Sequence, residues 1–333
     1  MVPLSLRVQL LAGLVAGLFL LGCGSAAPSE AGPFAEAHAS AQSWWPKAEA
    51  AFISGDPTAL SDLYAESALD VAKGQMQMAL LLGTRPKYPR PFRDSAIFLP
   101  TAGTNANWFL AIVRYAPVDQ DGRAGPVDMS APGMIFSNIS RTWKVIATGV
   151  QAPITHGLLS SNDSTFSAPL NDSRYLLPRS TVAPAYAAYL NSLSAGQQAD
   201  VPFPTGLNSF AGQFTRVAWP PSSIATAHFS FEVETPELAE YSISSGTTKV
   251  PEVVLFVLRR TVVMKPRQGC LVKRQGDLWS AAVPTGSYSA VTLTSISVVA
   301  ATVPFNNGDT SQGRKIIDIS AGIDDVSGVG IKC

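Results

Sequence analysis

The chain has 333 residues, with 24 Lys and Arg against 24 Asp and Glu, so its formal net charge is zero. A balanced charge argues against a nucleic-acid-binding protein, because contacts to phosphates need an excess of basic residues. The hydrophobic fraction of 46% excludes a largely disordered chain. Charged residues make up 14%, where soluble domains have about 25%. The length is enough for one large or two ordinary domains.

Residues 1–22 have the pattern of a signal peptide. Arg7 precedes an uncharged, mainly apolar run over residues 10–21, which is shorter than the roughly 20 residues that a spanning helix needs. The run ends in Leu-Leu-Gly-Cys at residues 20–23, which resembles the lipobox of bacterial lipoproteins. That resemblance implies that Cys23 carries a diacylglycerol and becomes the N-terminus after cleavage. The alternative is an ordinary secretory signal, or a membrane anchor, with an incidental cysteine.

The expected location is the outer face of the cytoplasmic membrane. Two acyl chains hold a protein durably at a bilayer, whereas one chain holds it only marginally. Residues 23–33 are rich in Ala, Ser, Gly and Pro, so they are expected to form a short lipidated tether. The membrane, through the lipid on Cys23, is therefore the first expected partner.

The two other cysteines, Cys270 and Cys333, are an even pair in an expected oxidising compartment. They either form a disulfide or remain two separate thiols. Neither belongs to a C-x-x-C motif, and the three histidines, His38, His156 and His228, are far apart in the sequence. We therefore expect no metal site and no cofactor.

The N-terminal part of the folded body is expected to be helical. Residues 34–82 are Ala-rich with helical spacing, interrupted at Pro46 and again at residues 55–57, where Asp56 can cap a helix that opens with Pro57. Bulky side chains along this segment are expected to share one core: Trp44, Trp45, Phe52, Leu60, Leu63 and Tyr64.

From residue 93 the pattern changes to short strands rich in β-branched and aromatic residues. We expect strands at residues 96–99, 108–115 and 134–148, with a turn at Asp121-Gly122. Residues 34–150 then form an N-terminal lobe of helices followed by a sheet. Residues 151–180 lose this periodicity and collect Ser, Asn, Asp and Pro, so they are expected to be an interdomain segment.

Residues 181–333 repeat the order of helices and then strands. The expected helices cover 181–193 and 207–217, and the expected strands cover 225–234, 253–263, 288–303 and 316–323. Helices followed by an antiparallel sheet, twice, give an α+β class with two lobes.

The order of helices before a curved sheet resembles the nuclear-transport-factor-2-like (cystatin-like) scaffold. Together with the lipobox and the Leu-Arg-Arg-Thr sequence at residues 258–261, the mature chain resembles a group of actinobacterial secreted lipoproteins that carry an uncharacterised domain. This resemblance implies a compartment and a fold, and it implies no activity.

One strand offers candidate acid–base groups. Along residues 226–234, His228, Glu232 and Glu234 share one face, and apolar residues share the other. If that face lines a pocket, His228 and Glu232 are a general acid and base for a hydrolase- or isomerase-like enzyme. The competing interpretation is a sheet with one face on the core and one in water. No G-x-S-x-G, S-x-x-K or Walker A motif supports catalysis in the mature chain.

Two basic stretches are candidate contacts for anionic surfaces. The first contains Arg85, Lys87, Arg90 and Arg93, and the second begins at Arg259 and Arg260. Close to an anionic membrane each cation contributes at most about 1 kcal/mol. They either contact anionic lipid or cell-wall polymers or belong to ordinary solvated loops. The sequence favours a non-catalytic binding or assembly module at the cell envelope and identifies no protein partner.

Overall fold

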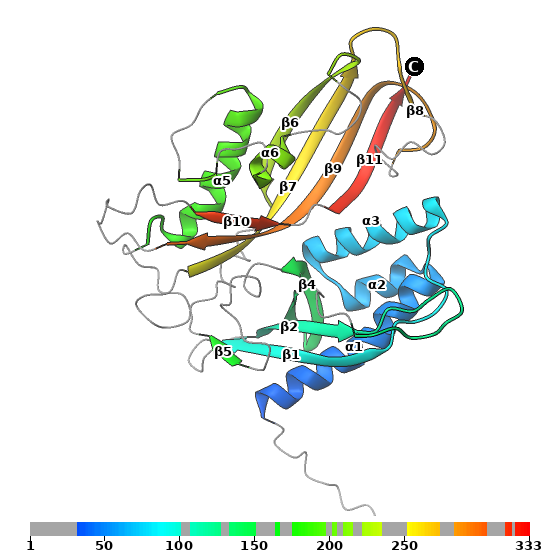
Figure 1. Ribbon diagram of the computed structural model, residues 1–333, viewed down its shortest axis with the longest axis vertical. Helices are drawn as coiled ribbons and strands as arrows, with labels where there is room; N and C mark the ends of the chain where they lie inside the picture. Colours follow the sequence, from blue (N-terminus) through cyan, green and yellow to red (C-terminus); the bar gives the residue numbers. More distant parts are fainter. Residues whose placement is uncertain are drawn as a thin grey trace, which may run out of the picture.

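The computed structural model describes most of the chain after residue 31. The described ranges are 32–100, 107–127, 133–150, 164–166, 175–197, 202–204, 209–215, 222–234, 252–273, 283–304, 317–321 and 324–333. They form helices and two sheets of mainly antiparallel strands, so the α+β class is confirmed (Figure 1). The predicted signal peptide, almost all of the predicted tether and most of residues 151–180 lie outside the described residues.

The first helix, α1 (Pro33–Ser54), continues through Pro46, so the predicted break at that residue is wrong. A proline inside a helix removes one backbone hydrogen bond, here the one to the carbonyl of Gln42. Pro46 and Gln42 both lie on the exposed face of α1, where water can satisfy that carbonyl. The break comes instead at Gly55, whose φ of 72° is the left-handed conformation that glycine adopts easily.

The next two helices are α2 (Pro57–Leu63) and α3 (Glu66–Leu82). The predicted cap is confirmed, because the Asp56 side chain accepts a hydrogen bond from the backbone N–H of Thr58 at 2.8 Å. α3 ends at Gly83, where the N–H of Thr84 donates to the carbonyl oxygen of Ala79. This end of α3 leads directly into the first basic stretch.

The first sheet contains five strands in the order β4-β3-β2-β1-β5. They are β1 (Phe92–Pro100), β2 (Trp108–Tyr115), β3 (Gly133–Ile139), β4 (Thr142–Val150) and β5 (Ser164–Phe166), and β5 runs parallel to β1. The single strand expected over residues 134–148 is in fact the hairpin of β3 and β4. Its turn residues, Ser140 and Arg141, both have positive φ without the Asn or Gly that signals such a turn in a sequence.

Helices α1 to α3 cover one face of this sheet (Figure 1). Their shared core contains Trp44, Trp45, Leu60, Leu63 and Tyr64, with Phe52 packed against it, which confirms the predicted set. Trp44 packs edge-on to Tyr64 and Phe136, and its indole N–H donates to the carbonyl oxygen of Leu63 at 2.9 Å. Satisfying the buried indole N–H lets this large ring serve as core.

The C-terminal half contains two helices and a six-stranded sheet. The helices are α5 (Arg179–Ser194) and α6 (Phe210–Phe214), which is shorter than the helix expected over residues 207–217. The strands are β6 (Ala225–Val233), β7 (Glu252–Pro266), β8 (Leu271–Lys273), β9 (Gly286–Val303), β10 (Asp318–Ala321) and β11 (Asp324–Lys332). The sheet order is β10-β9-β7-β6, and β8 and β11 also pair with β9. β5, β8 and β11 were not predicted.

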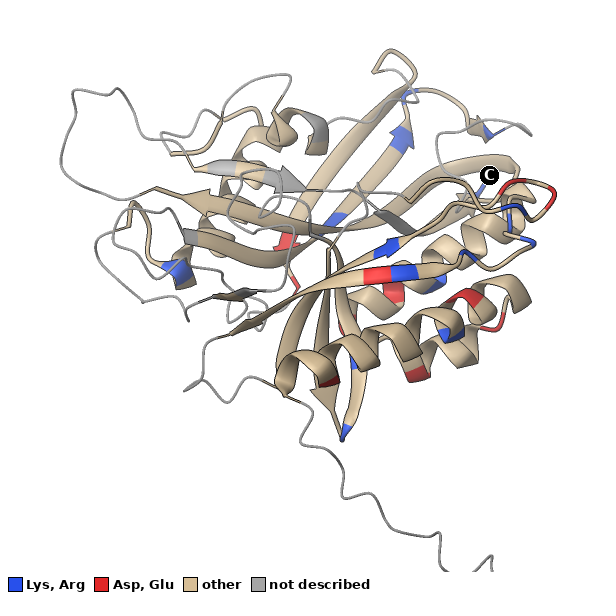
Figure 2. Cartoon of the chain, turned by 60° about the horizontal axis from the view of Figure 1, so that its bottom comes forward, with Lys and Arg blue, Asp and Glu red and all other residues tan. Residues whose placement is uncertain are grey.

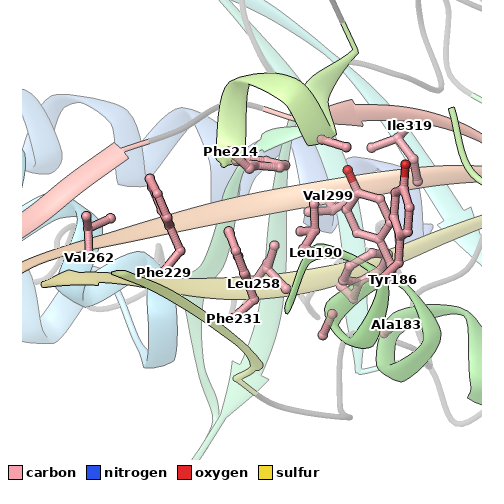
Figure 3. Close-up of a cluster of buried hydrophobic side chains, with 14 of the residues drawn as sticks. Ala183, Tyr186, Leu190, Phe214, Phe229, Phe231, Leu258, Val262, Val299 and Ile319 are labelled. Carbon is pink, nitrogen blue, oxygen red and sulfur yellow. The ribbon is translucent and has the colours of Figure 1, made fainter. Parts of the chain in front are cut away.

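The helices of the C-terminal half pack on one face of its sheet. Figure 3 shows Tyr186 and Leu190 of α5 and Phe214 of α6 gathered with Phe231 of β6 and Leu258 of β7. All five side chains are buried. The buried face of α5 is therefore the one that the i, i+3, i+4 spacing of its apolar residues predicts.

The other face of this sheet packs against the first sheet. Val253, Leu255 and Val257 of β7 belong to one buried cluster with Phe98 of β1 and Leu110 of β2. The alternate residues of β7, such as Phe256, face α5, so the run at residues 253–258 is buried on both faces. The layer order is helices, sheet, sheet, helices.

Side chains of α5 cover the free edge of β6. Asn191 donates from Nδ2 to the carbonyl oxygen of Phe231 and accepts from its backbone N–H, both at 2.9 Å. We expect Asn191→Leu to lower the free energy of unfolding by about 2 kcal/mol, because it leaves two backbone groups without partners. Urea denaturation measures this loss. Gln197→Ala, at an exposed position just beyond α5, is the control and should change stability by less than about 0.5 kcal/mol.

A disulfide joins Cys270, just before β8, to Cys333, just after β11. The backbone N–H of Cys333 also donates to the carbonyl oxygen of Ser287 at 3.1 Å. The disulfide therefore joins the start of β8 to the end of β11, and both of these strands pair with β9. Among the described residues no helix has the length and apolar character needed to cross a membrane.

Candidate functional site

The first basic stretch lines a cleft of about 610 Å³ between α3 and the loop that follows β2. We call this the basic cleft, and its lining residues are Gly83, Thr84, Arg85, Pro86, Lys87, Tyr88, Arg90, Tyr115, Pro117, Val118, Asp119 and Gln120. Its volume falls in the range of about 300–1,000 Å³ that is usual for ligand sites. The structure thus gathers three of the four predicted cations of this stretch, Arg85, Lys87 and Arg90, at one cavity.

A tight turn forms the second wall of the basic cleft. The Asp119 carboxylate accepts hydrogen bonds from the backbone N–H groups of Asp121 and Arg123, at 2.9 and 2.8 Å. Gly122 has a φ of 84°, and a Cβ at this position would lie 3.3 Å from the ring of Tyr88. The expected turn at Asp121-Gly122 is confirmed, and the aromatic ring of Tyr88 connects the two walls.

Arg90 lines the basic cleft and its side chain is 40% exposed, but its guanidinium is already paired within the protein, and its role as a contact for an anionic surface stays a prediction. Its guanidinium forms a hydrogen-bonded ion pair with Glu49 of α1, with Nη2 2.6 Å from Oε1, and its backbone N–H donates to Oε2. Its Cζ atom lies 4.7 Å from the ring centroid of Tyr115 and 5.3 Å from that of Trp45. The Glu49 side chain is only 4% exposed, so this carboxylate depends on Arg90 for its charge balance.

The ion pair of Arg90 and Glu49 also shifts pKa values beside the cleft. Burial alone would lower the pKa of Arg90, but the hydrogen bond and the charge of Glu49 outweigh burial and raise it. Burial, and then the charge of Glu49, raise the pKa of Tyr64, against a smaller opposite effect of Arg90. Arg90 therefore stays charged and Tyr64 stays neutral over the physiological pH range.

The remaining cations of the stretch are exposed. Arg85 donates to the carbonyl oxygen of Ser54 at 3.3 Å, which holds its side chain against the end of α1, and Lys87 and Arg93 are exposed. Arg93 does not line the cleft, because it lies on β1 beyond the loop. Figure 2 shows basic and acidic segments together at this end of the molecule. Arg85 and Lys87 beside two tyrosines suit an anionic group attached to a flat or apolar body.

The first two cations of the second basic stretch, Arg259 and Arg260, are engaged in contacts within the protein. Arg259 pairs with Glu234 and, at 3.3 Å, with Asp70 of α3, so it links the two halves of the molecule. Arg260 points to the opposite side of β7, with Cζ 5.4 Å from the ring centroid of Phe229. The two guanidinium groups are separated because neighbouring residues of a strand face opposite sides, and their role as contacts for an anionic surface stays a prediction.

The candidate acid–base pair is not brought together. His228 and Glu232 are both exposed on β6. They are four residues apart on one strand, so their Cα atoms are separated by about 13 Å. The expected alternation is present, with Phe229 and Phe231 buried on the other face. The face with His228 and Glu232 is thus a solvated sheet surface in this region.

Three residues of this region were not predicted from the sequence: Tyr115 and Asp119, which line the cleft, and Glu49, which pairs with Arg90. Glu49 follows Trp45 at i+4 in an Ala-rich segment, which was the signal of an acid on the buried face. Tyr115 ends a predicted strand, but its contact with Arg90 depends on the packing of α1 against the sheet. No pattern in the sequence predicted that α1 and the end of β2 both contact Arg90.

Comparisons with protein-family models, with curated proteins and with solved structures give no match. Within the described part of the chain, no group of three or more His, Cys, Asp or Glu side chains is placed to hold a metal ion. The basic cleft is therefore the candidate functional site of the described residues.

Proposed function

We propose that this chain is an extracytoplasmic lipoprotein, held at the outer face of the cytoplasmic membrane by a diacylglycerol on Cys23, that binds anionic groups of the cell envelope through the basic cleft. The protein acts by binding or assembly. The lipobox-like sequence at residues 20–23 supports the anchor. The two exposed cations at the cleft, Arg85 and Lys87, support the binding role.

The basic cleft is the observation that carries the binding proposal. Arg85 and Lys87 stand on a loop fixed on both sides, by Arg85 against Ser54 and by Arg90 in its ion pair with Glu49. A loop fixed in this way loses little conformational entropy when a ligand binds. Asp119 also lines the cleft, but its carboxylate already accepts two backbone hydrogen bonds. The ligand chemistry is therefore a phosphate or carboxylate group.

Binding of a soluble polyanion tests the cleft. The chain from residue 24 onwards contains every described residue, and short-chain polyphosphate is the probe. We expect Arg85→Glu/Lys87→Glu to weaken binding about tenfold, because the two cations together contribute at most about 2 kcal/mol and 1.4 kcal/mol is tenfold in affinity. Titration calorimetry at low salt measures it. The control, Lys265→Glu/Lys332→Glu, makes the same charge change at exposed positions of the C-terminal half and should leave more than half of the affinity.

Substitution of Cys23 tests the anchor. Cys23→Ala removes the sulfur that receives the diacylglycerol, so the variant should be released as a soluble protein or remain as the unprocessed precursor. Cell fractionation and the mass of the purified chain measure both outcomes. Ser25→Ala, two residues away, is the matched control and should be retained like the wild type. Membrane retention of a Cys23→Ala chain that has the mass of the processed protein would contradict the lipoprotein assignment.

We also infer that each half is nuclear-transport-factor-2-like, and that the chain belongs with the actinobacterial lipoproteins that it resembles. In both halves helices precede the sheet in the chain and cover one of its faces. The buried run at residues 253–258 leads into the Leu-Arg-Arg-Thr sequence. These features support the relation at the level of fold.

A further inference from the structure

We propose that the end of α3 beside the basic cleft docks onto an anionic phospholipid bilayer, with leucine side chains inserted below the phosphates and Arg85 and Lys87 at the level of the phosphates. This inference rests on the proposed function and names the ligand of the same site. We call Leu80, Leu81 and Leu82 the leucine rim. They are 49%, 55% and 51% exposed.

The leucine rim projects from the body of the protein. Successive residues of an α-helix point about 100° apart, so three consecutive side chains cover most of its circumference. All three can be half exposed only where the last turn extends past the core, as the right-hand end of α3 does in Figure 1. Tyr88 in the following loop is another exposed large side chain, at 43%. Large apolar side chains grouped in this way mark an interaction site.

The cations lie next to the leucines. A Cβ at Gly55 would lie 3.0 Å from Nη1 of Arg85 and 3.7 Å from Cδ2 of Leu80, so both side chains contact the same point at the end of α1. Leu82 precedes Gly83 and Thr84, which line the basic cleft. Apolar side chains bordered by basic ones are the composition of segments that lie in a membrane interface. This charge pattern favours an anionic bilayer over a protein partner.

The proposed anchor places this surface within reach of the membrane. The lipid on Cys23 is nine residues from Gly32, a distance of at most about 30 Å. α1 then runs about 33 Å from Pro33 to the end that Arg85 contacts. The exposed face of α1 carries one acid, Glu36, and one base, Lys47, so a body lying with α1 along the bilayer buries little charge.

A nitroxide at Leu81 measures the insertion directly. The full lipoprotein carrying Leu81→Cys has one free thiol, because Cys23 is acylated and Cys270 is bonded to Cys333. It is placed in vesicles of equal parts phosphatidylglycerol and phosphatidylcholine. Power-saturation EPR should locate the label about 5–10 Å below the phosphates. Ile224→Cys, an exposed apolar position in the C-terminal half, is the control and should remain in water.

The contrasting outcomes separate this inference from the proposed function. Adding Arg85→Glu/Lys87→Glu, or using phosphatidylcholine alone, should return the Leu81 label to water. A label in water on phosphatidylglycerol vesicles, in a protein that still binds polyphosphate, would overturn membrane docking and leave the proposed function intact. A label inserted equally in phosphatidylcholine alone would refute the anionic headgroup as the ligand. If neither polyphosphate binding nor insertion is observed, the proposed function fails as well.

Discussion

Replacing Cys270 and Cys333 together by serine is expected to lower the free energy of unfolding by about 4 kcal/mol, because the bond closes a long loop in the unfolded chain. The two cysteines are 63 residues apart, and the loop between them contains β8, β9, β10 and β11. Without the bond, β11 is held by its pairing with β9 and by its contacts with α3. Urea denaturation of the variant and the wild type measures the loss.

Two comparisons isolate the effect of the bond. Ile331→Ser changes an exposed side chain of β11 near the disulfide, and it should alter stability by less than about 0.5 kcal/mol. Wild-type protein kept in reductant should match the double serine variant. Hydrogen exchange should show the earliest opening in β11, since this strand ends at the bond. A loss below about 1 kcal/mol in the double variant would contradict the loop-closure account.

Arg90→Met is expected to lower the free energy of unfolding by about 2–3 kcal/mol, because it leaves the Glu49 carboxylate buried without its partner. We expect a smaller loss than the roughly 3–5 kcal/mol seen when a fully buried ion pair is broken, because the Arg90 side chain is 40% exposed and partly screened by water. The cation–π contacts with Tyr115 and Trp45 are lost as well. Denaturation at neutral pH measures this change.

The double variant Glu49→Leu/Arg90→Met should recover most of that stability, because an apolar pair of similar size avoids the buried charge. Arg93→Met is the matched control at an exposed position and should be near neutral. Equal stability of Arg90→Met and the wild type would show that Arg90 does not balance the charge of Glu49.

The candidate site was partly visible in the sequence. Arg85, Lys87 and Tyr88 occur together in a Pro-rich segment, and such a composition predicts an exposed loop with cations. The sequence did not distinguish Arg90 from Arg85 and Lys87, although Arg90 pairs with a buried carboxylate and the other two cations are exposed. That difference depends on Glu49, 41 positions earlier in the chain, which α1 brings under the loop. Long-range packing of this kind leaves no local pattern.

The sequence alone determined the α+β class, the cap at Asp56, the helix break at Gly55 and the aromatic core around Trp44 and Trp45. These features depend on hydrophobic periodicity and on capping and turn residues, which act within a few positions. Only the tertiary structure decided which surface covers the second face of β7, and it assigned that face to the first sheet. Likewise, only the tertiary structure shows that Arg259 pairs with Asp70 and Arg90 with Glu49. The sequence alone does not show whether a charged side chain contacts solvent or an oppositely charged residue. Its surroundings in the folded chain determine this.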